Sequence, residues 1–215
     1  GAAARVYDRT GPEDQPADAY MTVAGYFNSL RELGGMRRLV EDDVRTRCAQ
    51  AEARVPRDAV GPHPYVKRRE LLEPVELTSR ESTATIAQTK ARLALPHPHD
   101  RHVDVLLASN MISVGVDIDR LGLMVVAGQP KTTSEYIQAS SRVGRQPRWP
   151  GLVVTCFNVH KPRDRSHYER FVSYHESFYR YVEAQSLTPF SAPAVERGLA
   201  GVLTALVRLG EPAMT

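Results

Sequence analysis

Cysteine is scarce in this chain: two of its 215 residues are cysteines, Cys48 and Cys156. They are too few for a disulfide framework and too far apart for a local metal-ligand motif, so we expect a reducing, cytoplasmic location. Long apolar runs are also missing, because none approaches the roughly 18 residues of a membrane span. Hydrophobic residues make up 42% and charged residues 25% of the chain. These values are ordinary for a globular protein and exclude disorder and collagen.

Lysine is scarce as well, and its placement excludes a phosphate-binding loop. Such a loop ends in Gly-Lys-Ser/Thr, whereas the four lysines follow Val66, Thr89, Pro130 and His160. The acidic run at 41–43 follows a helix-like segment instead of closing a buried strand, so we do not interpret it as a Mg²⁺ site. The chain therefore lacks the loop with which such proteins usually bind the phosphates of a nucleoside triphosphate.

Short apolar runs alternate with helix-like segments through the middle of the chain. This alternation predicts an α/β fold with an open, mostly parallel sheet and helices on both faces. Near-continuous hydrophobicity in the later runs is typical of strands buried on both faces. The expected strands are 19–27, 74–77, 103–108, 123–127 and 152–157, and the expected helices are 28–47, 78–95 and 132–142.

Two of the expected helices begin with a capping-box spacing, in which Thr precedes Glu by three residues. Thr78 with Glu81, and Thr132 with Glu135, have this spacing. Each pair predicts that its Thr caps the helix that follows.

Two amphipathic stripes follow the last expected strand. We interpret both as core packing rather than as surfaces that stack on nucleic-acid bases. Their members are Tyr168, Phe171, Tyr174, Phe178 and Tyr181 in the first, and Val195, Leu199, Val202, Leu203 and Leu206 in the second. The chain begins with neither Met nor a signal peptide. We divide it into the edge of a larger protein at 1–18, a sheet domain at 19–160 with an insertion at about 49–67, and a helical extension at 161–215.

Basic charge gathers between residues 120 and 170, where nine Lys and Arg face three Asp and Glu, a local net charge of +6. The excess indicates either a phosphate-bearing partner or a solvated face, and charge alone leaves both interpretations open. Lys161, Arg163 and Arg165 surround Pro162 in this range. They are placed to line a nucleic-acid path, with salt-sensitive backbone contact and no reading of base sequence.

Small polar residues follow the expected strand at 103–108. Ser109, Asn110 and Ser113 would present short donors and backbone N–H groups at the carboxyl edge of the sheet, which suits a phosphodiester. Gly115 allows close backbone approach, and Asp117 can accept from a ribose hydroxyl. Such a combination also arises by chance in α/β proteins, so by itself it leaves the function open.

A second polar group ends the expected helix at 132–142. Arg142 and Arg145 are three residues apart and project to the same side near the helix end. Two guanidinium groups suit the charge on a transferring phosphoryl group, and Gln138, one turn earlier, can orient a water or a phosphate oxygen. The alternative is a surface arginine pair, which the helix dipole favours at a C-terminus.

Together the two groups resemble motifs V and VI of superfamily two helicases, in the family's order and separated by one strand. Gly115 and Asp117 occupy the Gly-x-Asp positions, and residues 138–145 fit the Gln-x-x-Gly-Arg-x-Gly-Arg pattern. Residues 23–30 are similar to motif IV, and residues 76–80 to the strand that follows it. The resemblance implies a second RecA-like domain, the C-terminal half of an ATP-dependent nucleic-acid helicase or translocase.

The resemblance also implies roles for these residues. Arg145 would be an arginine finger, with Arg142 and Gln138 facing the phosphates, and Gly115 and Asp117 would contact the cofactor. The nucleic-acid phosphates would be held by Ser109, Asn110, Ser113, Thr78 and Ser79. ATP and Mg²⁺ would be held mainly by an N-terminal RecA-like domain of the same parent protein. We therefore expect no cofactor on this chain alone and no ATP hydrolysis by it.

Two positions depart from the family pattern. Ser141 stands at the usual first Gly of motif VI, and Ala139 stands where many members have Arg. Both departures favour an alternative function, a non-enzymatic nucleic-acid-binding or scaffold module whose nucleotide site has lapsed.

Residues 25–35, together with 188–191 and 197–199, resemble helicase-related proteins of the bacterial antiphage system DISARM. The resemblance implies partner proteins from a defence system and a single- or double-stranded nucleic acid, DNA in preference to RNA. It implies no membrane partner.

Three histidines, His97, His99 and His102, stand close together in a proline-containing turn. Their spacing suggests a metal site, but no cysteine and no second ligand group accompanies them in the sequence. We therefore expect a solvated loop and no metal.

Overall fold

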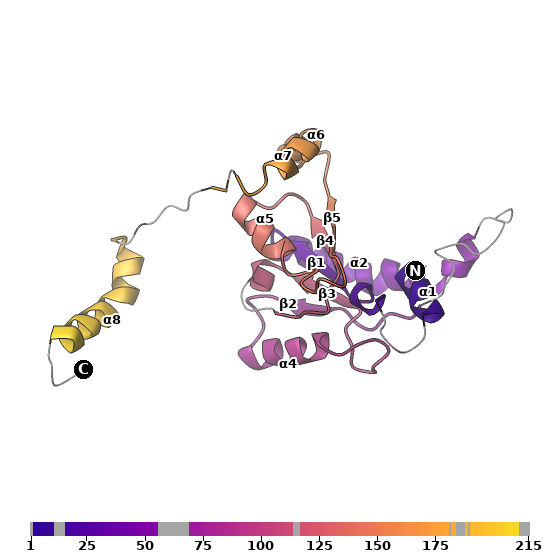
Figure 1. The fold of residues 1–215 in the computed structure, drawn as a ribbon, viewed down its shortest axis with the longest axis horizontal. Helices are drawn as coiled ribbons and strands as arrows, with labels where there is room; N and C mark the ends of the chain where they lie inside the picture. The colour runs from indigo at the N-terminus through magenta and orange to yellow at the C-terminus, as the bar shows by residue number, and fades with distance from the viewer. Residues whose placement is uncertain are drawn as a thin grey trace. The chain divides into compact units, whose positions relative to one another are not determined.

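The computed structural model describes residues 2–10, 16–55, 69–113, 117–180, 182–183, 188 and 190–210. Contacts divide the chain into two compact units, Gly1–Val182 and Glu183–Thr215. The first unit holds a five-stranded parallel sheet in the order β2-β3-β1-β4-β5 (Figure 1). The strands are β1 (Val23–Phe27), β2 (Val75–Leu77), β3 (Val105–Ala108), β4 (Leu123–Ala127) and β5 (Leu152–Cys156). The expected parallel α/β sheet is confirmed.

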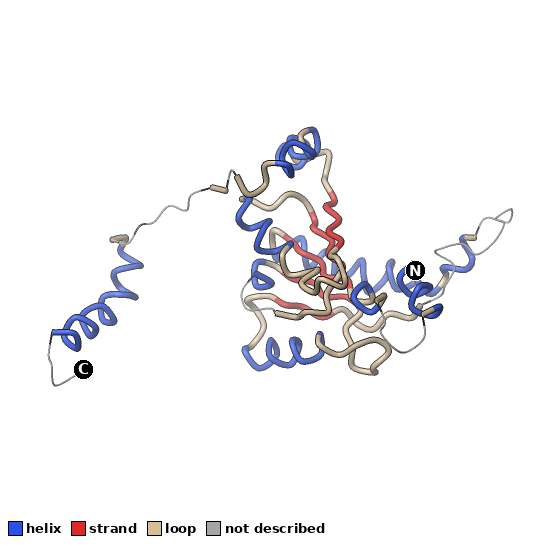
Figure 2. The backbone as a smooth tube through the Cα atoms, in the orientation of Figure 1, coloured by secondary structure: helices blue, strands red, loops and turns tan. Residues whose placement is uncertain are grey.

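Helices lie on both faces of this sheet (Figure 2). Side chains along each strand alternate between the two faces, so both faces carry apolar side chains that the helices cover. On one face, Leu93 of α4 (Thr83–Leu93) and Tyr136 of α5 (Thr133–Ser140) join a core with strand residues such as Met124. On the other face, Leu33 of α2 (Leu30–Leu39) packs with Leu107. The fold is thus the layered arrangement that the alternating sequence pattern predicts.

The last strand differs from its expected burial. Leu152 is 54% exposed and Val154 is 42% exposed, although residues 152–157 were expected to be a buried strand. That expectation was wrong because β5 pairs only with β4 and so forms an edge of the sheet. Register places Leu152, Val154 and Cys156 beside Leu123, Val125 and Ala127. Of these residues, Cys156 joins Leu123, Val125 and Ala127 in lining an apolar cavity of about 860 Å³ next to α2.

The helix expected over 28–47 is interrupted. It begins as predicted, with the Ser29 hydroxyl accepting a hydrogen bond from the Glu32 amide, but α2 ends at Leu39. A π-helical turn (Val40–Val44) and a short helix α3 (Arg45–Ala49) continue it. The 3₁₀ turn Ala51–Arg54 follows, and residues 56–68 of the expected insertion lie outside the described residues.

The two predicted caps have different outcomes. Thr132 caps α5 as predicted, with its hydroxyl accepting from the Glu135 amide. Thr78 does not cap α4, because residues 78–81 form a turn in which the Glu81 amide donates to the Thr78 carbonyl. Ser82 caps α4 instead, accepting from the Thr85 amide at 3.1 Å. A capping-box spacing alone cannot exclude a turn before the helix.

Short helices complete the first unit: α1 (Ala2–Arg9), α6 (Pro162–Glu169), α7 (Phe171–Glu176) and the 3₁₀ turns Asp18–Tyr20 and Asn110–Ser113. Tyr174 and Phe178 pack against the sheet core, as expected of the aromatic stripe. Tyr168 and Phe171 do not follow that expectation, since they are 68% and 43% exposed. Each of these two rings instead packs edge-on against Phe157, at 6.0 and 6.3 Å between ring centroids, and Tyr181 lies outside the described residues.

The second unit contains one described helix, α8 (Ala192–Gly210), which is 19 residues long. None of its described residues is buried, so core packing of its aliphatic stripe is not observed. Within its own unit the helix has no second described element against which the stripe could pack. No described helix of the chain is long and apolar enough to span a membrane.

Candidate nucleotide and nucleic-acid site

The polar residues of interest gather where the parallel strands end. Ser109 follows β3 and Thr78 follows β2, and the two turns meet because the Ser109 amide donates to the Leu77 carbonyl. Ser109 and Thr78 are buried, whereas Ser79 and Asn110 are exposed. The Ser109 hydroxyl donates to the Asn110 side-chain oxygen at 3.3 Å. Of the four, Ser79 and Asn110 are thus the ones whose side chains face solvent.

Part of the first predicted motif is not described. The Ser113 side chain and residues 114–116, including Gly115, lie outside the described residues. Asp117 is described, and its side chain is 70% exposed.

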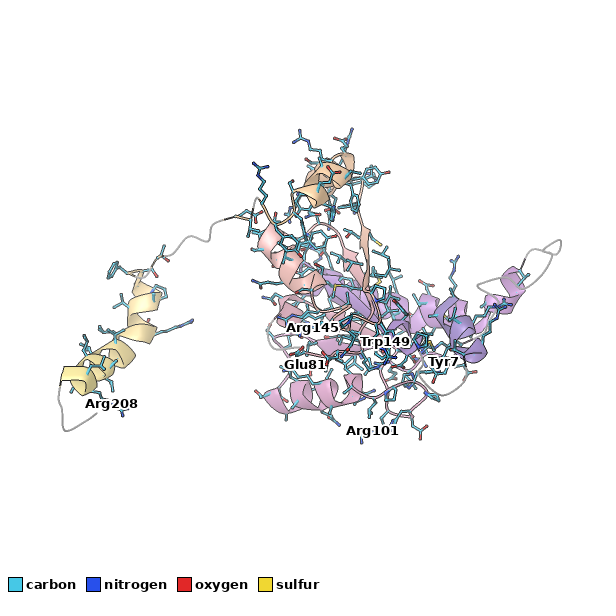
Figure 3. All side chains as sticks on the ribbon, viewed as in Figure 1. Tyr7, Glu81, Arg101, Arg145, Trp149 and Arg208 are labelled. Carbon is cyan, nitrogen blue, oxygen red and sulfur yellow. The ribbon has the colours of Figure 1, made fainter. Side chains whose placement is uncertain are left out.

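The two predicted motifs meet at an ion pair that involves Arg145, which is labelled in Figure 3. Arg145 donates from Nη1 to Asp117 Oδ1, and its Nε donates to the Ser141 carbonyl at 3.3 Å. The Arg145 side chain is 29% exposed. Asp117 and Arg145 are 28 positions apart in the sequence, but the fold brings the carboxylate and the guanidinium group together beside the end of α5. A half-exposed pair of this kind can exchange partners with a phosphate at little cost.

Gly144 holds Arg145 in this position. Its φ is +71°, which L side chains rarely adopt, and a Cβ there would lie 2.3 Å from the Gly151 amide nitrogen. The Gly144 amide donates to the Leu121 carbonyl at 2.8 Å, which ties the motif to the start of β4. The glycine at this motif position therefore has a structural reason within this chain.

The remaining motif VI residues lie along the end of α5. Gln138 is exposed and Arg142 is half-buried. Ser141 has φ −68° and ψ −1°, a conformation open to any residue, so a glycine is not required there. Ala139 is fully buried in the core, where a long charged side chain would not fit. Both departures from the family pattern fit the local packing.

The sequence did not reveal the residues that brace this edge. The Asn28 side-chain amide donates to the carbonyls of Ala127, Gly128 and Gln129, which fastens the end of β1 to the end of β4. Asp164, in α6, is 2% exposed and accepts from the amides of Gln129 and Asn158 at 2.9 and 2.8 Å. In the sequence, the only indication of this role is that both residues are polar and lie near the ends of strands.

The basic residues of the 120–170 range have different surroundings. Arg120 is nearly buried, with its Nε donating to Asp18 at 2.9 Å, so it does not belong to a basic surface. Lys161 pairs with Glu32, and Arg165 pairs with Glu169 at 3.0 Å with both side chains exposed. Lys161 precedes α6 and Arg165 lies within it, and acidic partners partly match the charges of both.

Comparison with known proteins identifies the domain. The helicase conserved C-terminal domain family matches residues 67–146, a range that includes both Asp117 and Arg145. The chain carries the C-terminal helicase domain of a superfamily two helicase-like protein. This helicase domain is similar to DISARM protein DrmA of Bacillus paralicheniformis, with 47% identity over 195 residues, or 91% of this chain. The match spans 16% of that relative's length.

Two solved structures share the fold of the helicase domain. Helicase Lhr of Mycobacterium smegmatis, bound to ssDNA and AMP-PNP, has a TM-score of 0.55 and 14% identity and covers 86% of this chain and 20% of its own. The DUF1998 helicase MrfA, bound to DNA, has a TM-score of 0.55 and 14% identity, with 93% and 24% covered. At this level of identity the similarity shows the fold alone.

Proposed function

We propose that this domain is the C-terminal half of an ATP-dependent nucleic-acid helicase or translocase. Its partner is an N-terminal RecA-like domain of the same parent protein. That domain makes most of the contacts to ATP and binds the Mg²⁺. Nucleotide binding between the two domains closes the cleft, and release after hydrolysis reopens it, which moves the domains along the strand.

One observation carries this proposal: the ion pair between Asp117 and Arg145 joins two separate helicase motifs at one place. The guanidinium group is held by a carboxylate that is 70% exposed, so a nucleotide phosphate can replace it. Gln138 and Arg142 are on the same helix end and would face the phosphates with Arg145. Asp117 engages one carboxylate oxygen with Arg145, and the other oxygen remains to accept from the ribose.

The nucleic acid would run along the carboxyl edge of the sheet. Asn110 and Ser79 support this path because they are exposed there. Ser109, Thr78 and Ser113 would contribute through the backbone of their turns. DNA is the more natural substrate if the protein serves an antiphage system, as its similarity to DrmA suggests. Partner proteins of such a system would then bind the parent protein.

Replacement of Arg145 tests the proposal in the full-length protein. An arginine finger stabilises charge that appears mainly in the transition state and contributes on the order of 10³ to 10⁵ in turnover. Arg145→Ala should therefore lower kcat far more than it raises KM for ATP. Arg145→Lys should rescue poorly, because an ammonium group lacks the planar fork of a guanidinium group.

Arg148 provides the matched control, since it lies three residues beyond the motif. Arg148→Ala should leave ATP turnover nearly unchanged. Near-normal turnover in Arg145→Ala would show that Arg145 is only a charge at a helix end. If the unaltered full-length protein binds nucleic acid but hydrolyses no ATP, the scaffold function is correct instead.

The chain alone should not hydrolyse ATP, because its lysines lack the Gly-Lys-Ser/Thr setting of a phosphate loop. Phosphate release by the purified chain, with and without single-stranded DNA, measures this directly. Turnover above background, after contaminating ATPase activity is excluded, would contradict the assignment to the second half of a motor.

A further inference from the structure

A cluster of three ligand-type side chains lies at the amino edge of the sheet, opposite the edge described above. His97 and His102 belong to the loop between α4 and β3, and Asp104 immediately precedes β3. His97 Nδ1 is 3.3 Å from His102 Nε2, and His102 Nε2 is 3.0 Å from Asp104 Oδ1. Asp104, two positions after His102 in the sequence, is the second kind of ligand group that the sequence interpretation overlooked.

The cluster is not a solvated loop, which corrects the expectation from the sequence. His102 is 7% exposed and Asp104 is 2% exposed, while His97 is half-buried. The Tyr7 ring of α1 packs edge-on against the His97 ring at 5.0 Å between centroids. In Figure 3, Tyr7 lies well apart from Arg145, so the cluster is separate from the proposed nucleotide site.

Hydrogen bonding defines which atoms face the middle of the cluster. The His102 Nδ1–H donates to the His99 carbonyl at 2.5 Å, because a carbonyl oxygen can only accept. In neutral His102 the Nε2 atom therefore carries a lone pair, and this lone pair points at a carboxylate oxygen. His97 Nδ1, His102 Nε2 and one carboxylate oxygen of Asp104 lie within 4.8 Å of one another, so three ligand atoms of the kinds that hold a metal ion meet at one place.

The third side chain favours the metal ion. A hydrogen bond joins His102 Nε2 to one partner at a time, whereas a metal ion can bind His97 Nδ1, His102 Nε2 and Asp104 together. The two spacings that involve His102 Nε2, 3.0 and 3.3 Å, are close to the roughly 3.3 Å between ligands that sit ~2.0–2.1 Å from a tetrahedral Zn²⁺, and all three ligand atoms lie within 4.8 Å of one another. The bond from His102 Nδ1 to a backbone carbonyl is the outer contact that metal-bound imidazoles usually make.

The surroundings of Asp104 select the kind of ion. Arg69 donates to Oδ1, and the Leu72 amide donates to Oδ2 at 2.8 Å. The guanidinium group lowers the negative charge that the carboxylate offers, which weakens binding of Mg²⁺ or Ca²⁺ because these ions depend on oxygen ligands. Two imidazole nitrogens instead suit Zn²⁺ and its neighbours among the transition metals.

We propose that His97, His102 and Asp104 bind one divalent transition-metal ion, Zn²⁺ by the chemistry of their donors, and that the ion fastens the α4–β3 loop to the start of β3. The ion has a structural role here, since the cluster is remote from Arg145. Binding to the folded state alone would stabilise the domain in proportion to the logarithm of the zinc concentration above Kd. This inference stands independently of the proposed motor function.

The test uses the full 215-residue chain after removal of metals with a chelator. Titration of ZnCl₂ against a chromophoric chelator should show one bound equivalent, and the midpoint of thermal unfolding should rise with added zinc. His97→Ala should weaken zinc binding by more than about 100-fold, since loss of an outer contact alone costs about 10–100-fold. His97 is the chosen position because it is half-buried and its loss disturbs the core least.

His99→Ala is the matched control in the same loop. The His99 ring accepts from the Arg101 amide, outside the cluster, so this variant should bind zinc as the unaltered chain does. A second measurement needs no variant: zinc should protect His97, and not His99, from acylation by diethylpyrocarbonate, as read by mass spectrometry. The proposal is overturned if the chain binds no zinc, if His97→Ala binds it equally well, or if zinc leaves His97 unprotected. Those results would mean that hydrogen bonds alone, including those from Arg69 and the Leu72 amide to Asp104, hold the cluster together.

Discussion

Gly144 and Gly151 pack backbone against backbone, with a Cβ built on Gly151 only 3.0 Å from the Gly144 Cα. This contact lets the chain turn sharply after α5, so that Arg145 reaches Asp117 and β5 can begin at Leu152 beside β4. Gly144, a glycine of the motif VI pattern, therefore has a packing role in this domain.

Gly144→Ala should destabilise the chain by about 2–4 kcal/mol, since the positive φ and the contact with Gly151 each add strain. Urea unfolding monitored by circular dichroism measures the change. Gly35→Ala is the control, because Gly35 lies inside α2 with nothing within 4 Å of a Cβ. That variant should be more stable by roughly 0.5–1 kcal/mol. Equal stability of the two variants would mean that the turn after α5 is freely deformable.

Arg120→Ala should be strongly destabilising although Arg120 belongs to the basic stretch of the sequence. Its guanidinium group bonds to Asp18, to the Thr22 hydroxyl at 3.0 Å and to the Leu93 carbonyl at 3.0 Å, and only 10% of its side chain is exposed. Removing one partner of a buried ion pair costs about 3–5 kcal/mol. Thermal unfolding would measure the loss.

Arg165→Ala is the comparison for that experiment. Arg165 and its partner Glu169 are 67% and 58% exposed. An exposed pair contributes about 0–1 kcal/mol, so this variant should unfold close to the unaltered chain. A comparable loss in both variants would contradict the structural role of Arg120.

Binding of single-stranded DNA to the chain should be weak and should fall steeply between about 50 and 200 mM salt, because contacts to phosphates release counterions. Fluorescence anisotropy of a labelled oligonucleotide measures the slope of log K against log salt. Arg165→Ala should reduce that slope by about 0.7, the value for one phosphate on a single strand. Arg92→Ala should not change it, since Arg92 lies near the end of α4, which returns to the opposite edge of the sheet. Tight, salt-insensitive binding would indicate a stacking surface instead.

Alkaline pH should destabilise the domain through Tyr26. Burial, with the nearby negative charge of Glu135, raises the pKa of Tyr26 well above its ordinary value of 10.0. The folded state therefore keeps a proton that the unfolded state loses, so the contribution of Tyr26 to stability is constant below about pH 10 and decreases as the pH rises above it. Tyr26→Phe should show a smaller decrease over this range in urea unfolding at graded pH. An unchanged decrease would show that other groups cause the loss.

Local patterns in the sequence were sufficient for much of the fold. The strands at 103–108 and 123–127, the parallel α/β class and the cap at Thr132 depend on hydrophobic periodicity and on bonds between residues three apart. Residues close together in the sequence are enough to determine these features. The two helicase motifs were also recognisable because each is a short continuous segment.

Only the tertiary structure decided which distant groups meet. Strand order makes β5 an exposed edge, and no local pattern in residues 152–157 distinguishes an edge strand from a central one. The same order brings Asp117 to Arg145 and buries Arg120 against Asp18. Asp104 reaches His97 and His102 because the α4–β3 loop folds back onto the start of its own strand. Such pairings depend on how the whole chain closes around its core, so the sequence alone determined the elements and motifs, and packing determined their partners.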